Sequence, residues 1–153
     1  MRRHFIEEAI LSAEKSLLYK ANHGALVIFR GKIVGRGFNK MCIEHKNKVN
    51  RWSIHAEVDA IQDALRKITR ENLKKSIILV VRLRREGDIS LSAPCNDCAN
   101  YIKRCGIPIC YYSNENYKNE LEDNLSDTTS ICSWSSNSTN SNLDYNSCYE
   151  CEE

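Results

Sequence analysis

The stretch Ser76-Ile77-Ile78-Leu79-Val80-Val81-Arg82-Leu83 has the length of a β-strand and is the strongest strand pattern in the chain. Its apolar core does not alternate with polar residues, which is typical of a strand that is covered on both faces. Such a strand lies inside a sheet that carries helices on each side. Residues 76–83 therefore predict the buried centre of an α/β fold.

Helical and extended patterns precede this strand. Apolar residues recur at helical spacing near the N-terminus, and Gly31-Lys32 between two apolar runs predicts a tight hairpin turn. Lys and Asn residues dominate the stretch up to about Trp52, which predicts a polar loop. The expected elements before residue 76 are a helix over 5–19, strands over 23–30 and 33–38, and a helix from about His55 to Lys67.

A third helix and a fourth strand are expected after the central strand. The helix runs from about Cys95 to Cys105 and stops at Gly106, a common residue type at helix ends. The strand covers residues 107–112. Helices and strands that alternate after a hairpin imply a mixed sheet whose later strands are parallel, with helices on both faces.

The composition changes sharply from Ser113 onward. Ser, Asn and Thr dominate residues 130–146, and such a segment cannot bury enough apolar area to offset its chain entropy. At 153 residues the chain has room for one domain and a tail. We therefore expect a folded domain over 1–113 and an acidic, Ser- and Asn-rich tail over 114–153 that is largely disordered.

The charge is divided between these two parts. The formal net charge is +2 for the whole chain, but residues 114–153 carry −8 and residues 1–113 carry +10. A basic body favours an anionic partner, either a nucleotide phosphate or a nucleic acid. The basic residues are scattered along the sequence, so abundant solvated lysines explain the charge equally well.

Neither a membrane segment nor an export signal is expected. No apolar run approaches the roughly 20 residues that cross a bilayer, and glutamates interrupt the basic N-terminus, unlike a secretory signal. The expected location is therefore cytoplasmic, with no membrane partner. Without export, the eight cysteines do not indicate disulfides, and the closely spaced pairs among them favour metal binding.

The residues that suggest chemistry stand at two predicted helix starts. His55-Ala56-Glu57 opens the second helix, and Pro94-Cys95-Asn96-Asp97-Cys98 opens the third. The imidazole of His55 and the thiolates of Cys95 and Cys98 give zinc three ligands and leave the fourth tetrahedral position open for water, as in a catalytic site. Two helix N-termini at the metal also favour the thiolate anions.

Glu57 is the predicted catalytic residue. It lies two positions after His55 in the same first turn, so it can reach zinc-bound water without binding the metal. Zinc lowers the pKa of that water from near 16 to about 7, and a carboxylate can carry its proton to the ring nitrogen and the leaving amine. The H-x-E and P-C-x-x-C motifs are those of zinc base deaminases. They predict hydrolysis of cytosine to uracil with release of ammonia.

A second cysteine pair allows a different interpretation. Cys148 and Cys151 in the tail, together with Cys95 and Cys98, would form a four-cysteine structural zinc site in a non-catalytic binding module. The two pairs are much further apart than the usual roughly 15–20 residues, and this hypothesis leaves the His-Ala-Glu motif unexplained.

From about residue 5 to residue 113 the chain resembles the cytidine and deoxycytidylate deaminase superfamily. The segments that match are His23-Gly24-Ala25, Gly37-Phe38-Asn39, His55-Ala56-Glu57, Pro94-Cys95-Asn96-Asp97-Cys98-Ala99 and the strand from Gly106 to Tyr112. The resemblance implies a three-layer α/β/α sandwich around a mixed, roughly five-stranded sheet, and a homo-oligomer. It also implies that Asn39 and the backbone of Ala56 bind the substrate; the alternative for Asn39, an ordinary strand-end or turn residue, is the less favoured one.

The residues after Asn39 bear on the substrate. Free cytidine deaminases typically carry Asn-x-Glu here to hold the ribose, whereas Asn39 is followed by Lys40 and Met41. The missing carboxylate and the added lysine favour a phosphate-bearing substrate, most simply CMP or dCMP. Deaminases of RNA, single-stranded DNA or tRNA share the same site and are the alternative within enzymes.

Overall fold

The structure is a computed structural model that describes residues 1–18, 21–43, 51–114 and 131–135. Its elements, in chain order, are α1 (Arg3–Ala13), β1 (Asn22–Phe29), β2 (Lys32–Phe38), β3 (Lys40–Ile43), β4 (Arg51–Ile54), α2 (Ala56–Leu65), α3 (Arg70–Leu73), β5 (Ile77–Leu83), β6 (Ile89–Ser90), α4 (Asn96–Arg104), β7 (Ile109–Ser113) and β8 (Ile131–Ser135). In the described part of the chain, no helix has the length and apolar character of a membrane span.

A mixed sheet forms the middle of the molecule. Its main strands lie in the order β2-β1-β5-β7-β8, and the short β6 also pairs with β5. Strands β5 and β7 are parallel, with α4 in the crossover between them, while the other neighbours are antiparallel. The apolar stretch around β5 is therefore the centre of the sheet, as predicted.

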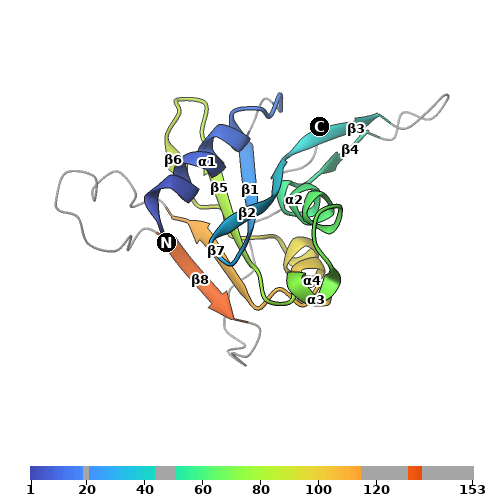
Figure 1. Ribbon diagram of the computed structural model, residues 1–153. Helices are drawn as coiled ribbons and strands as arrows, with labels where there is room; N and C mark the ends of the chain where they lie inside the picture. Colours follow the sequence, from blue (N-terminus) through green and yellow to red (C-terminus); the bar gives the residue numbers. More distant parts are fainter. Residues whose placement is uncertain (19–20, 44–50, 115–130, 136–153) are drawn as a thin grey trace.

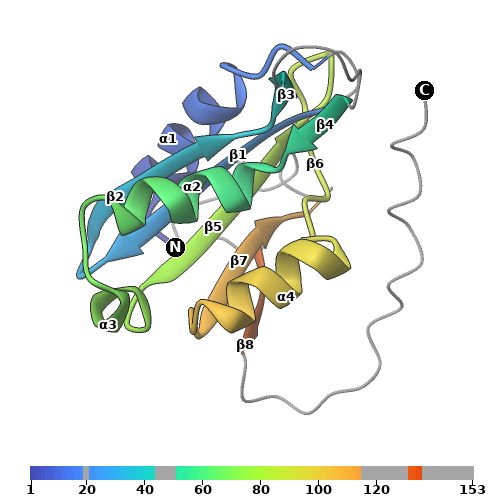
Figure 2. The same cartoon turned by 90° about the vertical axis from the view of Figure 1, so that its right-hand side faces the viewer.

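Helices cover both faces of this sheet, which confirms the predicted three-layer α/β/α arrangement. Figure 1 shows α1 on one side and α2, α3 and α4 on the other, and Figure 2 views the second set from the front. The apolar core is divided accordingly. Alternate residues of β5 pack under α1 (Leu79, Val81) or under α2 and α4 (Ile78, Val80).

Two segments expected to lack regular structure contain strands. The polar stretch before Trp52 includes the hairpin of β3 and β4, in which Lys40 is paired with Ile54. The tail includes β8, whose residues 131–135 pair antiparallel with β7. Composition misled the prediction because the exposed edge of β7 supplies backbone hydrogen-bond partners that need no apolar side chains. The rest of the tail lies outside the described residues, and the domain boundary at residue 113 stays a prediction.

The first helix is shorter than the periodicity predicted. It ends at Ala13 instead of continuing to residue 19, and Leu17 is 97% exposed. The hydroxyl of Ser16 donates a hydrogen bond to the backbone oxygen of Asn39 (2.8 Å), which ties the chain after α1 to the end of β2. A contact distant in sequence therefore overrides the local helical pattern.

Two glycines of β2 determine how close α2 lies to the sheet. A Cβ on Gly37 would collide with the backbone oxygen of Ala56 and the backbone nitrogen of Ala60. A Cβ on Gly35 would collide with the oxygen of Ala60 in the same way. The residues of α2 on this side are alanines, so the helix backbone lies directly against the strand. This packing fixes the start of α2.

We predict that Gly37→Ala destabilises the fold by about 1–3 kcal/mol, because the new methyl group meets backbone atoms that cannot move independently. Denaturant unfolding of the two proteins measures the difference. Lys32→Ala, at an exposed position of the same strand, is the control and should change stability by no more than about 0.5 kcal/mol. Equal effects of the two substitutions would contradict the packing described here.

Candidate active site

Two helices begin at the same end of the sheet, and their first residues face each other. His55 is the N-cap of α2 and Cys95 is the N-cap of α4, each with extended backbone geometry. Residues at N-caps commonly use their side chains to accept a hydrogen bond from the first turn, as Thr69 does for α3. Neither His55 nor Cys95 makes such a bond, so both side chains are available for another partner.

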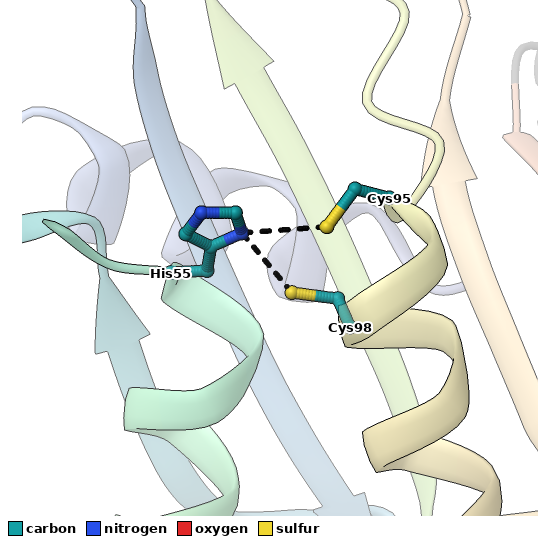
Figure 3. Close-up of side chains that lie close together, drawn as sticks. All are labelled: His55, Cys95 and Cys98. Carbon is teal, nitrogen blue, oxygen red and sulfur yellow. Dashed lines mark hydrogen bonds between the residues drawn. The ribbon is translucent and has the colours of Figure 1, made fainter. Parts of the chain in front are cut away.

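These two side chains and Cys98 form a compact cluster (Figure 3). The Nδ1 atom of His55 lies 3.2 Å from the sulfur of Cys98 and 3.6 Å from the sulfur of Cys95. All three donor atoms lie within 4.8 Å of one another. The structure therefore brings together the three predicted metal ligands. They come from the starts of two helices, whose N-cap residues are 40 positions apart in the sequence.

The segment before Cys95 is held firmly to the sheet. The Ser92 hydroxyl donates to the backbone oxygen of Val80 (2.8 Å), and the Ser92 backbone nitrogen donates to the oxygen of Ser113 (2.9 Å). Pro94 then limits the backbone immediately before the N-cap. The position of the first thiol is thus set by β5 and β7 and not by α4 alone.

The electrostatics of the cluster suit a cation. Hydrogen bonds with Cys98 and His55 lower the pKa of the Cys95 thiol to about 3, so a thiolate is present at neutral pH. The Cys95 sulfur and burial raise the pKa of the Cys98 thiol, and the hydrogen bond with Cys95 raises the pKa of His55. A cation bound by His55, Cys95 and Cys98 would take the place of the protons that these three side chains now share in hydrogen bonds. One nitrogen and two sulfur donors match zinc and leave one tetrahedral position open.

Glu57 lies next to the cluster and is not one of its three members. Its side chain is only 5% exposed, and burial raises the pKa of its carboxyl group. The thiol of Cys98 and the charge of His55 act in the opposite direction and favour the ionised carboxylate, so lowering its pKa. The predicted catalytic residue is therefore buried beside the donors, where it can exchange a proton with a group in the open position.

Asn39 and Ala56, the predicted substrate-binding residues, lie at the same end of the sheet. The Asn39 side-chain oxygen accepts from the His23 backbone nitrogen (2.7 Å), and its side-chain nitrogen donates to the Ala21 oxygen (2.8 Å). These bonds fix the carboxamide and leave its second N–H available. Ala56 is buried in the first turn of α2, where a helix has backbone N–H groups without intrahelical partners. A substrate role of either residue stays a prediction.

Lys40, the lysine that the sequence favoured for binding a phosphate, forms an ion pair within the protein. Lys40 Nζ lies 2.7 Å from Asp59 Oδ1, and the second oxygen of Asp59 accepts from the backbone nitrogen of Phe38 (3.3 Å). These two contacts of Asp59, which lies one turn after His55 on α2, join that helix to the end of β2 and to the start of β3. Sequence reasoning missed it because the partners are 19 residues apart and on different elements.

Two further residues at this end of the sheet were given little or no role by the sequence. His23 is half-buried; burial and the charges of Arg82 and His55 lower its pKa to about 4, so it is neutral at pH 7. Arg82 is its register partner on β5. The sequence could have drawn attention to Arg82, because it is the single charged residue inside the most apolar strand.

The tail cysteines Cys148 and Cys151 lie outside the described residues. Cys110, which lies within them, is part of the apolar core, and Cys105 packs against that core. Among the described residues, the only group of three or more possible metal-binding side chains is the His55, Cys95 and Cys98 cluster.

Known structures share this fold. The 1.6 Å crystal structure of cytidine deaminase from Burkholderia pseudomallei is 21% identical, with a TM-score of 0.58 over 88% of this chain and 93% of that chain. The dCMP deaminase from the cyanophage S-TIM5, in apo form, is 23% identical, with a TM-score of 0.50 over 74% of this chain and 86% of that chain. Comparison with curated proteins gives no match.

The sequence also matches a family model over residues 1–114, which include all the elements from α1 to β7 and all the clustered residues described above. That model describes the cytidine and deoxycytidylate deaminase zinc-binding region. The donor set of His55, Cys95 and Cys98 agrees with it, and zinc is accordingly the metal of this site. The chain belongs to the cytidine and deoxycytidylate deaminase family of zinc-dependent hydrolases.

Proposed function

We propose that this protein hydrolyses the exocyclic amine of the cytosine base in a nucleotide, most simply CMP or dCMP. Water supplies the oxygen that becomes the carbonyl at C4 of uracil, and the amine leaves as ammonia. The observation that carries this proposal is the buried carboxyl group of Glu57 beside a nitrogen and two sulfur donors that leave one metal position open.

The three clustered side chains hold the metal, and Glu57 moves protons beside it. When bound, zinc supplies a Lewis acid that makes water nucleophilic near neutral pH. The Glu57 carboxylate accepts the proton that the water loses and donates it to N3 of the ring. It then carries the second proton to the leaving amine. A pKa raised by burial suits this role, since the group has to both accept and release a proton at neutral pH.

Backbone and amide groups at the helix starts can orient the base. The backbone N–H of Ala56 lies in the first turn of α2, close to the metal ligand His55, and can donate to the pyrimidine. The second N–H of Asn39 can donate to the sugar or to the base edge, because the first is held by Ala21. The cytoplasmic location and the homo-oligomer expected from the sequence remain predictions.

A polynucleotide substrate is the second candidate, and the +10 charge of residues 1–113 favours it. The alternative outside enzymes, a structural four-cysteine zinc site, is disfavoured by the nitrogen donor within reach of both sulfurs. Pairing of His55 Nδ1 with Cys98 and Cys95 leaves no need for cysteines from the tail.

We predict that Glu57→Gln retains zinc and lowers the rate of ammonia release by at least about 100-fold, because an amide cannot accept the proton. Metal analysis and a coupled ammonia assay on the same preparation measure the two quantities. Glu71→Gln, an exposed residue paired with Lys74 on α3, is the control and should keep full activity. Full activity of Glu57→Gln would exclude the proposed mechanism.

The zinc ligands are tested by single substitutions. We predict about one zinc ion per chain in the wild type and much less in Cys98→Ser, which removes one of three protein ligands. Cys105→Ser, on the C-terminal end of the same helix, should keep the metal. Loss of zinc from a Cys148→Ser, Cys151→Ser double variant would instead support the structural four-cysteine site.

The substrate class is tested by a panel of cytidine, CMP, dCMP, single-stranded DNA and tRNA. We expect ammonia release to be most efficient with the mononucleotides, as judged by kcat/KM. Turnover of single-stranded DNA or tRNA that exceeds turnover of CMP and dCMP would favour the polynucleotide alternative. Zinc-loaded protein that acts on none of the five would contradict the proposed function.

A further inference from the structure

The end of β5 carries a charged residue that the proposed reaction does not use. Arg82 is half-buried, and its buried Nε atom has no hydrogen-bond partner in the part of the chain that the structure describes. No ion pair within residues 1–18, 21–43, 51–114 and 131–135 involves its guanidinium group. Buried donors in folded proteins nearly always find an acceptor, so this one calls for a physical explanation.

A second unsatisfied group lies beside it. In the described part of the chain, the one other buried side-chain nitrogen or oxygen atom without a partner is the hydroxyl oxygen of Ser90. Ser90 is on β6, is 2% exposed, and is the register partner of Arg82. Directly opposite residues of antiparallel strands point to the same face of a sheet. Two groups in need of a partner are therefore neighbours on one face.

That face is the one with the active site. Along β5, Ile78 and Val80 pack under α2 and α4, and side chains alternate along a strand, so Arg82 points to the same side. Arg82 lies near the C-terminal end of β5, and α2 and α4 both begin at this end of the sheet. Figure 3 shows β5 passing behind His55 and Cys95, with its arrowhead beyond them.

His23 connects Arg82 to the metal ligands. It is the register partner of Arg82 on β1, and its pKa responds to the charges of Arg82, His55 and Cys95. His23, Arg82 and Ser90 thus form a row across three adjacent strands, and His23 brings this row close to the metal ligands His55 and Cys95. Because His23 is neutral at pH 7, the positive charge of this row comes from Arg82.

We propose that Arg82 binds the phosphate group of the nucleotide substrate, with the Ser90 hydroxyl as a second donor; this rests on the proposed function. A guanidinium group presents several N–H donors in a planar fork that matches phosphate oxygens. Lys40, the cation that the sequence favoured for the phosphate, is held in an ion pair with Asp59. A bound phosphate would satisfy both buried groups that have no partner among the described residues.

Steady-state kinetics with dCMP and deoxycytidine test the assignment. Arg82→Gln should raise the KM for dCMP about tenfold or more, as expected for the loss of a hydrogen bond to a charged group. Its kcat/KM for deoxycytidine, which has no phosphate, should change little. Arg104→Gln, an exposed residue at the far end of α4, is the matched control. Arg82→Lys, which keeps the charge, should recover part of the loss.

Binding of the product provides a readout that does not depend on turnover. By calorimetry, zinc-loaded wild type should bind dUMP at least about tenfold more tightly than deoxyuridine, and Arg82→Gln should lose this difference while keeping its zinc. Ser90→Ala should reduce the difference by a smaller factor. Inorganic phosphate should weaken dUMP binding to the wild type but not to Arg82→Gln.

Two results would overturn the assignment. One is a wild type that binds dUMP no better than deoxyuridine. The other is an Arg82→Gln variant that retains zinc but loses affinity for dUMP and deoxyuridine equally, as a purely structural role of Arg82 would produce. Failure of the proposed function is distinguishable, because it appears as absent ammonia release by the wild type, whatever the binding data show.

Discussion

The start of α2 and the start of α4 lie over the same end of one sheet face, and the active site depends on this placement. The two starts are held independently. Gly35 and Gly37 let the α2 backbone lie directly on β2, while Ser92 ties the segment before Cys95 to β5 and β7. Neither N-cap side chain is used for capping, so both are free for the metal. A change at the glycines therefore moves one ligand without the others.

The zinc site could be predicted from sequence because its ligands stand at fixed positions in two local motifs. The central strand was equally clear, since its apolar run is continuous. The hairpin of β3 and β4 and the strand β8 could not be predicted, because their polar sequences become extended only through pairing with a neighbour. The same holds for the pairing of Lys40 with Asp59: the lysine was visible, but its partner depends on how α2 packs.

The charged groups around the metal have separate tasks in this account. Glu57 is buried beside the sulfur of Cys98 and is the residue we propose to move protons at the base. Arg82 lies on the sheet below, beside a neutral His23, and is assigned to the phosphate. The positive charge that we propose for substrate recognition is thus carried on the central strand, where strand register fixes its position. Recognition and chemistry share one sheet face but use different residues.

X-ray absorption spectroscopy at the zinc edge of the purified, zinc-loaded full chain tests the central claim most directly. We predict a four-coordinate ion with two sulfur neighbours at about 2.3 Å and two lighter neighbours, one nitrogen and one oxygen, at about 2.0–2.1 Å. The spectrum should keep this form in Glu57→Gln, since that residue does not bind the metal. A shell of four sulfur atoms, or an ion bound equally well without His55, would contradict the account.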